Sequence, residues 1–418
     1  MRYLSVFIFA LALVNMKTYA QEKGIVFEKG MQWGQLLAKA KKENKLIFLD
    51  CYTTWCAPCK RMAQNVFKST EVGQFMNEKF ISVSMQMDST KHDEDLIKAA
   101  YSEAHEIAVK NTIDVYPTFL FFSPNGNVSH RCVGEYDVNG FLDVAKDALN
   151  PDKQYYSLSE KFKKNNRSPE IIVDFVEAAV KAGFDSIAIA NSGLYIRNLK
   201  NPFLKGKIKI ILSLTKSSSS DGYNLFLRNI QQVDDNFEDQ IAEHTIINIL
   251  LKEEAEPLYQ SKDSLINWTS LRAKLQEKSN ANLADRAIAK EKLTYYEWRG
   301  DWDEYEKTLI YYLNAYGRKI NGLVINNYLW NIFVHSDNTD NILNFLPWSK
   351  STLVVDGQTQ LESYDTYANL LYKVGRKDDA IFWEQKGMQI AKEQRNDAEE
   401  KIFNETINKM KRNEKTWL

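Results

Sequence analysis

The sequence predicts an α/β domain with a mixed central sheet flanked by helices, followed by an all-helical domain. From residue 25 to about residue 150, apolar runs suited to strands alternate with segments of helical periodicity. After "NPDK" at 150–153, strand signals almost vanish, and the remaining chain has helical periodicity and is rich in Lys, Glu, Asn, Leu, Ile and Tyr. We therefore assign the first domain to residues 21–150 and the second to residues 151–418.

The elements of the first domain follow from local patterns. The segment 45–52, "KLIFLDCY", is apolar almost throughout, which is typical of a strand buried on both faces. Further strands are expected at 24–30, at 80–88 and in a hairpin within 117–134 that turns at Pro-Asn-Gly. Helices are expected at 33–45, 59–67, 94–111 and 138–149.

The second domain carries a weak internal repeat. Segments 293–316 and 367–391 each place an aromatic and leucine-rich helix before a glycine turn and a second helix. Gly300 and Gly375 lie 75 positions apart, about twice the roughly 34-residue unit of helix-turn-helix solenoids. The second copy resembles a tetratricopeptide repeat in its small and apolar positions, and the best repeats are expected within 287–418: Ala368, Leu371, Gly375, Ala380 and Ala391. An irregular helical domain without true repeats is the alternative.

Composition excludes several classes of function. Lys and Arg (54) almost balance Asp and Glu (55), so nothing indicates nucleic acid or an anionic membrane surface as the main partner. Four cysteines in 418 residues are too few for a disulfide-stapled scaffold. The sequence contains no GxxxxGK[ST], no HExxH and no GxGxxG after a strand, and so no familiar nucleotide or metal motif.

Residues 1–20 have the layout of a secretory signal peptide. Arg2 precedes an apolar run at 3–14, and Thr18 and Ala20 place small residues before a cleavage site. The run is shorter than the roughly 20 residues that a membrane-spanning helix needs, which favours cleavage over anchoring. No cysteine follows the run as a lipoprotein signal would require. The mature chain is expected to start at Gln21 and to work outside the cytoplasm.

The segment "WCAPCK" holds two cysteines between a predicted strand and a predicted helix. Cys56 would lie near a helix N-terminus, where unpaired N–H groups and the helix dipole stabilise a thiolate. Pro58 suits the first helical turn, and Cys59 one turn on can reach back to Cys56. Zinc normally needs four ligands, but there is no second CxxC and the five histidines are scattered. A structural disulfide closing so small a loop would stabilise little. A redox-active dithiol without metal or other cofactor is favoured over both.

Residues 45–149 resemble the thioredoxin family. "WCAPCK" matches the family's W-C-x-P-C-K, with Ala57 where glycine is usual, and Asp50 falls on the family's buried acid. "VYPTF" matches the segment that carries the cis-proline, so the resemblance implies that Pro117 is cis and packs against the cysteines. "NGNVSHRCVG" matches the last hairpin, with Gly134 on the glycine beside the active site.

The resemblance implies roles for these residues. Cys56 would be the nucleophile, Cys59 the resolving thiol, and Asp50, with a pKa raised by desolvation, the proton acceptor for Cys59. The implied substrate-binding residues, around a main chain that could pair with a peptide as an added strand, are Trp55, Tyr116, Pro117 and Thr118. The implied active-site loop residues are Ala57, Pro58 and Lys60.

Departures from the family pattern put some of this in doubt. Ser84 stands where the family has a lysine near the buried acid, so the acid's partner is open. Pro117 follows Asp88 by 29 positions, more than a typical thioredoxin needs, which predicts an extra helical piece near the rim of the site. Cys51 is expected to act as a small core residue. Whether Cys132 pairs with it, or either takes part in redox chemistry, is left open.

Together these features predict an exported thiol–disulfide oxidoreductase, resembling extracytoplasmic thioredoxin-family proteins of the Gram-negative periplasm. Its WCAPC dithiol is expected to reduce or isomerise disulfides in protein substrates, with re-reduction by a membrane or extracytoplasmic redox partner. A further protein partner could bind the helical domain. The alternative is a helical-repeat module that binds proteins or peptides, with the first domain as a scaffold.

Overall fold

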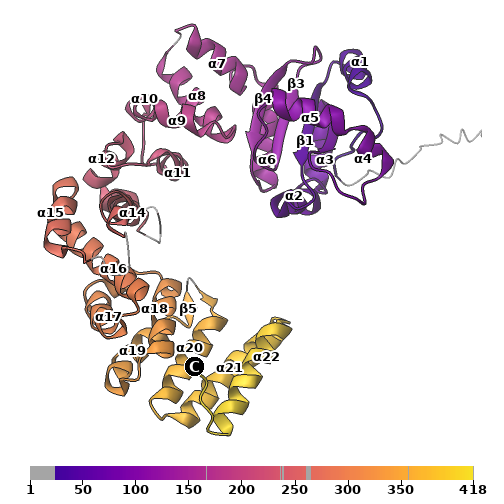
Figure 1. The fold of residues 1–418 in the computed structure, drawn as a ribbon. Coiled ribbons are helices and arrows are strands. Elements are labelled where there is room, and N and C mark those ends of the chain that lie inside the picture. Colours follow the sequence, from indigo (N-terminus) through magenta and orange to yellow (C-terminus); the bar gives the residue numbers. More distant parts are fainter. Residues whose placement is uncertain are drawn as a thin grey trace, which may run out of the picture. The chain divides into compact units, whose positions relative to one another are not determined.

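The computed structural model describes residues 24–165, 167–235, 237, 240–259, 265–355 and 357–417. The predicted signal peptide at 1–20 lies outside these residues. The chain divides into two compact units, one ending at Lys200 and the other beginning at Asn201. Figure 1 shows the sheet in the first unit and helices throughout the second.

A mixed four-stranded sheet organises the N-terminal unit. Its order is β2-β1-β3-β4; β1 and β2 are parallel, and the other two pairs are antiparallel. The strands are β1 (Leu46–Tyr52), β2 (Phe80–Gln86), β3 (Thr118–Phe122) and β4 (Val128–Val133). The strand predicted at 24–30 is wrong, because this segment makes only a single bridge, from Phe27 to Ser82, and turns away at Gly30, whose φ is +68°.

Strand side chains alternate between the two faces of the sheet, and here both faces carry apolar side chains. Helices therefore cover both faces. Phe48, Phe119 and Phe121 face a phenylalanine-rich core that also contains side chains from η1, α3 and α6. Leu49 and Leu120 face a more aliphatic core completed by α1 and α5. The helices of this part are α1 (Trp33–Glu43), α2 (Ala57–Arg61), the π-helix η1 (Met62–Val66), α3 (Thr70–Lys79), α4 (Asp95–Ala99), α5 (Tyr101–Lys110) and α6 (Val138–Leu149).

Four further helices belong to the same compact unit, which runs past the predicted boundary at residue 150 to Lys200. They are α7 (Tyr155–Lys163), α8 (Pro169–Lys181), α9 (Asp185–Ala190) and α10 (Ser192–Asn198). We call this segment, residues 155–198, the helical extension. Its helices α7 and α8 lie against the edge strand β4 (Figure 1). The edge of the sheet is therefore buried, although the elements that cover it follow the last helix of the α/β pattern.

The C-terminal unit is built mainly of helices. They are α11 (Lys205–Leu214), α12 (Asp221–Arg228), α13 (Ile230–Asp234), α14 (Ile241–Glu254), α15 (Trp268–Lys278), α16 (Ala281–Arg299), α17 (Trp302–Tyr316), α18 (Gly322–His335), α19 (Thr339–Ser351), α20 (Leu361–Lys373), α21 (Lys377–Glu393) and α22 (Asp397–Lys411), with short 3-10 turns η2 (Glu256–Leu258) and η3 (Gly317–Lys319). Two-residue strands β5 (Val354–Val355) and β6 (Gln358–Thr359) form a small hairpin.

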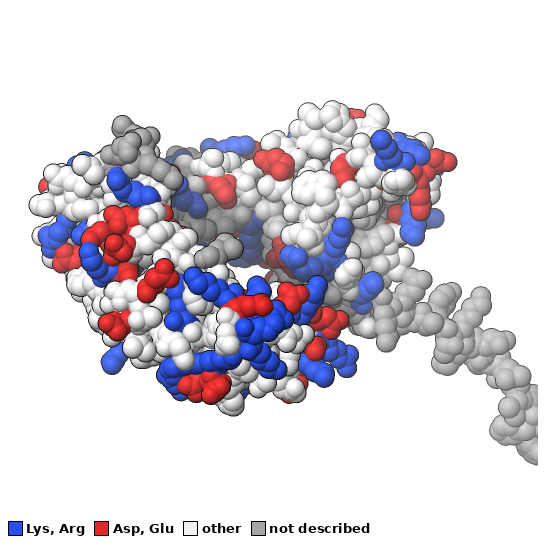
Figure 2. Space-filling model, turned by 60° about the horizontal axis from the view of Figure 1, so that its bottom comes forward, with Lys and Arg blue, Asp and Glu red and all other residues white. Residues whose placement is uncertain are grey.

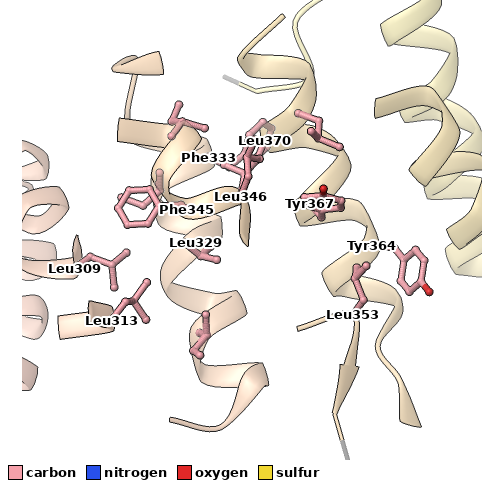
Figure 3. Close-up of a cluster of buried hydrophobic side chains, with 14 of the residues drawn as sticks. Leu309, Leu313, Leu329, Phe333, Phe345, Leu346, Leu353, Tyr364, Tyr367 and Leu370 are labelled. Carbon is pink, nitrogen blue, oxygen red and sulfur yellow. The ribbon is translucent and has the colours of Figure 1, made fainter. Parts of the chain in front are cut away.

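Both predicted helix–glycine–helix segments are present in this unit. Gly300 separates α16 from α17, Gly375 separates α20 from α21, and both have the positive φ that glycine adopts readily. Leucine, phenylalanine and tyrosine side chains from successive helices fill one continuous core, part of which Figure 3 shows around Leu329, Phe345 and Tyr367. The tetratricopeptide character of these helices stays a prediction.

Basic and acidic side chains are interspersed on the face drawn in Figure 2. Within the described part of the chain, no helix has both the length and the apolar character needed to cross a membrane.

Candidate active site

Cys56 and Cys59 lie at the start of α2, shortly after the end of β1. Cys56 is the N-cap residue of α2 and its Sγ accepts a hydrogen bond from the Cys59 N–H at 3.1 Å. Pro58 occupies the first turn, where its missing N–H leaves no helical hydrogen bond unmade. The two sulfurs are joined in a disulfide, with 5.3 Å between the Cα atoms. Only 3% of Cys56 and 6% of Cys59 is exposed, so a partner reaches this disulfide over a small area.

The helix that carries the disulfide is held on its inner side by packing against the sheet. After Arg61, α2 continues as the π-helix η1, whose buried Met62 and Val66 pack in the phenylalanine-rich core. On the outer side, Ala57 and Lys60 are exposed and Pro58 is half-buried. The predicted loop residues therefore form the solvent side of the helix, while the core holds its inner side.

The loop before β3 supplies the second wall of the site. The Tyr116–Pro117 peptide bond is cis, as the family resemblance implied. The Pro117 carbonyl accepts the Gly134 N–H at 2.9 Å, and the buried Thr118 hydroxyl donates to the Val115 carbonyl at 2.7 Å. These bonds fix both ends of the cis peptide.

An exposed aromatic pair joins the two walls. The ring of Trp55, next to the disulfide, meets the ring of Tyr116 edge-on at 5.9 Å between centroids. Trp55 is 69% exposed, which is unusual for so large an apolar side chain. The predicted substrate-binding residues thus come together from two segments about 60 residues apart in the sequence.

Asp50 is the buried acid of this region. It is 6% exposed and lies on β1 two positions from Phe48, so it faces the side of the sheet on which η1 packs. Burial raises its pKa to about 7, although the Ser84 hydroxyl, which donates to Oδ2 at 2.9 Å, partly offsets this. Ser84 is the direct neighbour of Asp50 on β2. The acid's partner is therefore a hydroxyl rather than a cation.

The other two cysteines face opposite sides of the sheet. Cys51 packs in the aliphatic core and Cys132 in the phenylalanine-rich core, and both are free and buried. Burial raises the pKa of both thiols. Because the sheet separates them, they cannot form a disulfide with each other in this fold.

Sequence reasoning missed Asp88, which holds the segment before Trp55. Its carboxylate accepts hydrogen bonds from the Thr54 N–H at 3.0 Å and from the Thr54 hydroxyl. A signal for it existed: Asp88 follows β2, and the carboxyl ends of the parallel strands β1 and β2 meet at one edge of the sheet. The segment between Asp88 and Pro117 contains the helices α4 and α5, and an extra helical piece at the rim of the site stays a prediction.

Comparison with known proteins places the chain among relatives. A family model described as a thioredoxin-like domain matches residues 33–149. Thioredoxin-1 of Saccharomyces cerevisiae is 35% identical over 92 residues, which cover 22% of this chain and 71% of that protein. The chain belongs to the thioredoxin family. The matched domain is a thiol–disulfide oxidoreductase domain, and it contains the Cys56–Cys59 disulfide.

Other relatives match the same thioredoxin-family domain. The thiol:disulfide interchange protein DsbD of Pseudomonas fluorescens is 27% identical over 109 residues, 25% of this chain and 17% of that protein. A Bacteroides thetaiotaomicron protein assigned as a disulphide-isomerase, with a known solution structure, is 34% identical and covers 31% of this chain and 98% of its own, with a TM-score of 0.26. The chain spans only 9% of Spermatogenesis-associated protein 20 of Rattus norvegicus, to which it is 37% identical over 73 residues.

Among the residues that the structure describes, no group of three His, Cys, Asp or Glu side chains is placed to hold a metal ion. The thioredoxin-family domain thus combines the disulfide with an aromatic pair from two distant segments, and Asp50 lies on the sheet face on which the turn after the disulfide packs.

Proposed function

We propose that this protein is an exported thiol–disulfide oxidoreductase that reduces or isomerises disulfides in proteins outside the cytoplasm. The observation that carries the proposal is the Cys56–Cys59 disulfide at the start of α2, next to Trp55, whose ring contacts Tyr116 of the cis Tyr116–Pro117 bond. The signal-like residues 1–20 support export, and the similarity to DsbD supports work on protein disulfides.

In the reduced protein, Cys56 is the attacking thiol. The N–H groups and dipole of the helix that begins beside it favour the thiolate. The thiolate attacks one sulfur of the substrate disulfide, the substrate S–S bond breaks, and the other substrate sulfur leaves as a thiolate. Cys56 is then joined to the substrate in a mixed disulfide.

Cys59 resolves this intermediate with the help of Asp50. Because its pKa is about 7, Asp50 is partly ionised near neutral pH and can accept the Cys59 proton. The Cys59 thiolate attacks the Cys56 sulfur, the mixed disulfide breaks, and the second substrate sulfur leaves and is protonated. Two electrons have passed to the substrate, and the protein ends as the disulfide seen here.

Substrate docking uses the wall opposite the cysteines. Pro117 has no N–H, and the main chain of Tyr116 beside it can pair with an extended substrate segment. Trp55 and Tyr116 provide apolar contact area, and Thr118 holds the loop through its bond to the Val115 carbonyl. Ala57, Pro58 and Lys60 border the disulfide on its solvent side.

Turnover as a reductase needs an electron donor, since each cycle leaves the protein oxidised. A membrane or extracytoplasmic dithiol protein would supply the two electrons by the same exchange chemistry. The helices of the C-terminal unit, with the predicted tetratricopeptide-like pairs around Gly300 and Gly375, offer a surface for a further protein partner.

The deciding experiment is the reduction potential of the Cys56–Cys59 pair, measured by equilibrating the protein in graded thiol buffers, together with insulin reduction assays. A potential near that of thioredoxin, roughly −270 mV, would support a reductase. A potential near that of DsbA, roughly −120 mV, would reverse the direction and make the protein a disulfide donor. Full biological activity in a Cys56→Ser, Cys59→Ser variant would instead favour the scaffold alternative.

A further inference from the structure

Arg131, on the edge strand β4, is a buried cation whose hydrogen bonds go to backbone carbonyls. It is 1% exposed, and its Nη1 donates to the carbonyls of Asn111 at 2.6 Å and Thr112 at 3.0 Å. The carboxylate of Asp114 lies 3.9 Å from Nη2 and is largely exposed. A buried charge is costly unless its hydrogen bonds are made. The guanidinium is therefore tied mainly to the backbone of the loop between α5 and β3.

The bound loop needs such support. Thr112 has a φ of +52°, a left-handed conformation that a β-branched residue rarely adopts. Its carbonyl is one of the two that Arg131 binds. Residues 113–116 lead from this point directly to Pro117. Arg131 thus holds the start of the segment 112–117, and the Thr118 hydroxyl holds its end. This segment carries Tyr116, which contacts Trp55.

The helical extension holds Arg131 from the other side. The ring of Phe184, in the connection between α8 and α9, lies 4.8 Å from the guanidinium carbon, in cation–π geometry. The neighbouring Gly183 packs so closely on Val133 that a Cβ there would lie 3.0 Å from a Val133 methyl group. Val133 is paired with Thr118 across the sheet. The α8–α9 connection therefore contacts β4 at the end nearest Pro117.

We propose that Arg131 is a positioning residue for the substrate-binding loop and that Phe184 of the helical extension keeps it in place. The contacts run from Phe184 to the Arg131 guanidinium, then to the Asn111 and Thr112 carbonyls, then along the loop to Tyr116 and Pro117. The helical extension thereby takes part in shaping the docking wall of the site. The substrate-related half of this proposal rests on the oxidoreductase function proposed above.

The test compares Phe184→Ala with Phe162→Ala in the full-length protein. Phe162 is a matched control, because it lies in the same helical extension, is also half-buried, and carries the guanidinium of Arg167 at 4.6 Å, but stacks on Phe175. Hydrogen exchange of the amides of residues 112–116 is measured for both. Reduction of insulin gives KM and kcat, and reaction with oxidised glutathione reports the dithiol without a large docking surface.

We expect Phe184→Ala to speed exchange at 112–116 and to raise KM for insulin, each several-fold, with kcat, the reduction potential and the glutathione reaction unchanged. Phe162→Ala should change none of these. Arg131→Lys, which keeps the charge but loses the fork that spans both carbonyls, should act in the same direction as Phe184→Ala.

Two results would overturn the proposal. Equal exchange at 112–116 in the two phenylalanine variants would show that Phe184 does not hold the loop. Faster exchange with an unchanged insulin KM would show that the loop is held but does not position substrate. Failure of the unmodified protein to exchange any disulfide would sink the proposed function instead, and the exchange comparison would still decide whether Phe184 and Arg131 support the loop.

Discussion

Both units of the molecule bury a carboxylic acid, and the two acids have different surroundings. Asp50 in the N-terminal unit is 6% exposed, hydrogen-bonded by Ser84, and on the sheet face where the helix carrying the disulfide is anchored. Glu384 in the C-terminal unit is fully buried between α20 and α21 and faces Asp365 and Asn369. Burial raises the pKa of both acids. A shifted pKa is therefore shared by both units, but of these two acids only Asp50 lies in the unit that carries the Cys56–Cys59 disulfide.

The difference follows from the architecture of the units. A sheet brings together segments that are distant in sequence, so Asp50 pairs with Ser84, and the Pro117 carbonyl meets the Gly134 N–H. In the helical unit, buried polar contacts join helices to neighbouring helices or to their ends, such as Glu306 with Ser336 or Lys373 with the Phe333 carbonyl. There the buried polar groups fix how helices pack. A buried acid indicates chemistry only when the fold also delivers a reacting group to it.

The largest effect should come from removing the thiol of Cys56, the proposed nucleophile. Cys56→Ser is expected to abolish disulfide exchange, because the thiolate that forms the mixed disulfide is lost. Insulin reduction measures this. Cys51→Ala is the matched control: it removes a buried free thiol one residue from Asp50, and should leave the potential unchanged while lowering stability by about 1 kcal/mol. Insulin reduction by Cys56→Ser would contradict the assigned nucleophile.

Asp50→Asn should separate stability from catalysis. The folded pKa of about 7 exceeds the ordinary value of 3.8, so the ionised acid destabilises the fold increasingly as pH rises from 3.8 to 7, and fully above 7. The variant should therefore gain up to about 4 kcal/mol in free energy of unfolding at pH 8, and less than half of that at pH 5. Denaturant unfolding of the oxidised protein at both pH values measures it.

The same substitution should slow the resolving step. An amide cannot accept the Cys59 proton, so the mixed disulfide should persist about a hundredfold longer near neutral pH. Quenched single-turnover reactions with a peptide disulfide measure its lifetime. Asp143→Asn, on the exposed side of α6, is the control for both readouts. A stabilised variant with an unchanged lifetime would leave Asp50 as a buried acid without a catalytic role, like Glu384.

Local signals in the sequence predicted most of the sheet and the centre of the site. The apolar run at 45–52 and the hairpin within 117–134 became β1, β3 and β4, and the helical pattern at 138–149 became α6. The cysteine pair lies at the expected helix start because WCAPCK itself specifies a helix N-terminus with a tight first turn. The helix α3 was missed, and the helix predicted at 94–111 is broken at Ala100.

The features that the sequence did not predict depend on burial by segments that are distant in the chain. His130 and Arg131 are polar residues on an edge strand, where solvent exposure is the ordinary expectation, yet α7 and α8 bury both. The residue that covers Arg131 is Phe184, 53 positions away, and no local sequence pattern predicts this contact. The pKa of Asp50 likewise depends on how deeply the packed domain buries it. Such properties arise only from the packed structure.

The smallest effect should come from Glu384, the buried acid of the C-terminal unit. Glu384 shares a hydrogen bond with Asp365, and burial raises the pKa of Glu384 well above 4.5 and that of Asp365 to about 6. The Asn369 amide donates to Asp365 at 2.9 Å, and Glu399 on α22 adds negative charge. The two carboxyls therefore stay close because they hold a proton in the folded protein. Keeping this proton lowers the free energy of unfolding, increasingly as pH rises above their ordinary pKa values.

Glu384→Gln should remove this cost while keeping the shape, because its amide can donate to Asp365 where the acid's proton did. We expect a gain of roughly 1–3 kcal/mol in free energy of unfolding at pH 8, little gain at pH 4, and no change in the reduction potential. Glu393→Gln, on the exposed side of the same helix, is the control. A changed potential in Glu384→Gln would contradict the distinction between the two acids, because it would show that the acid of the helical unit influences the disulfide.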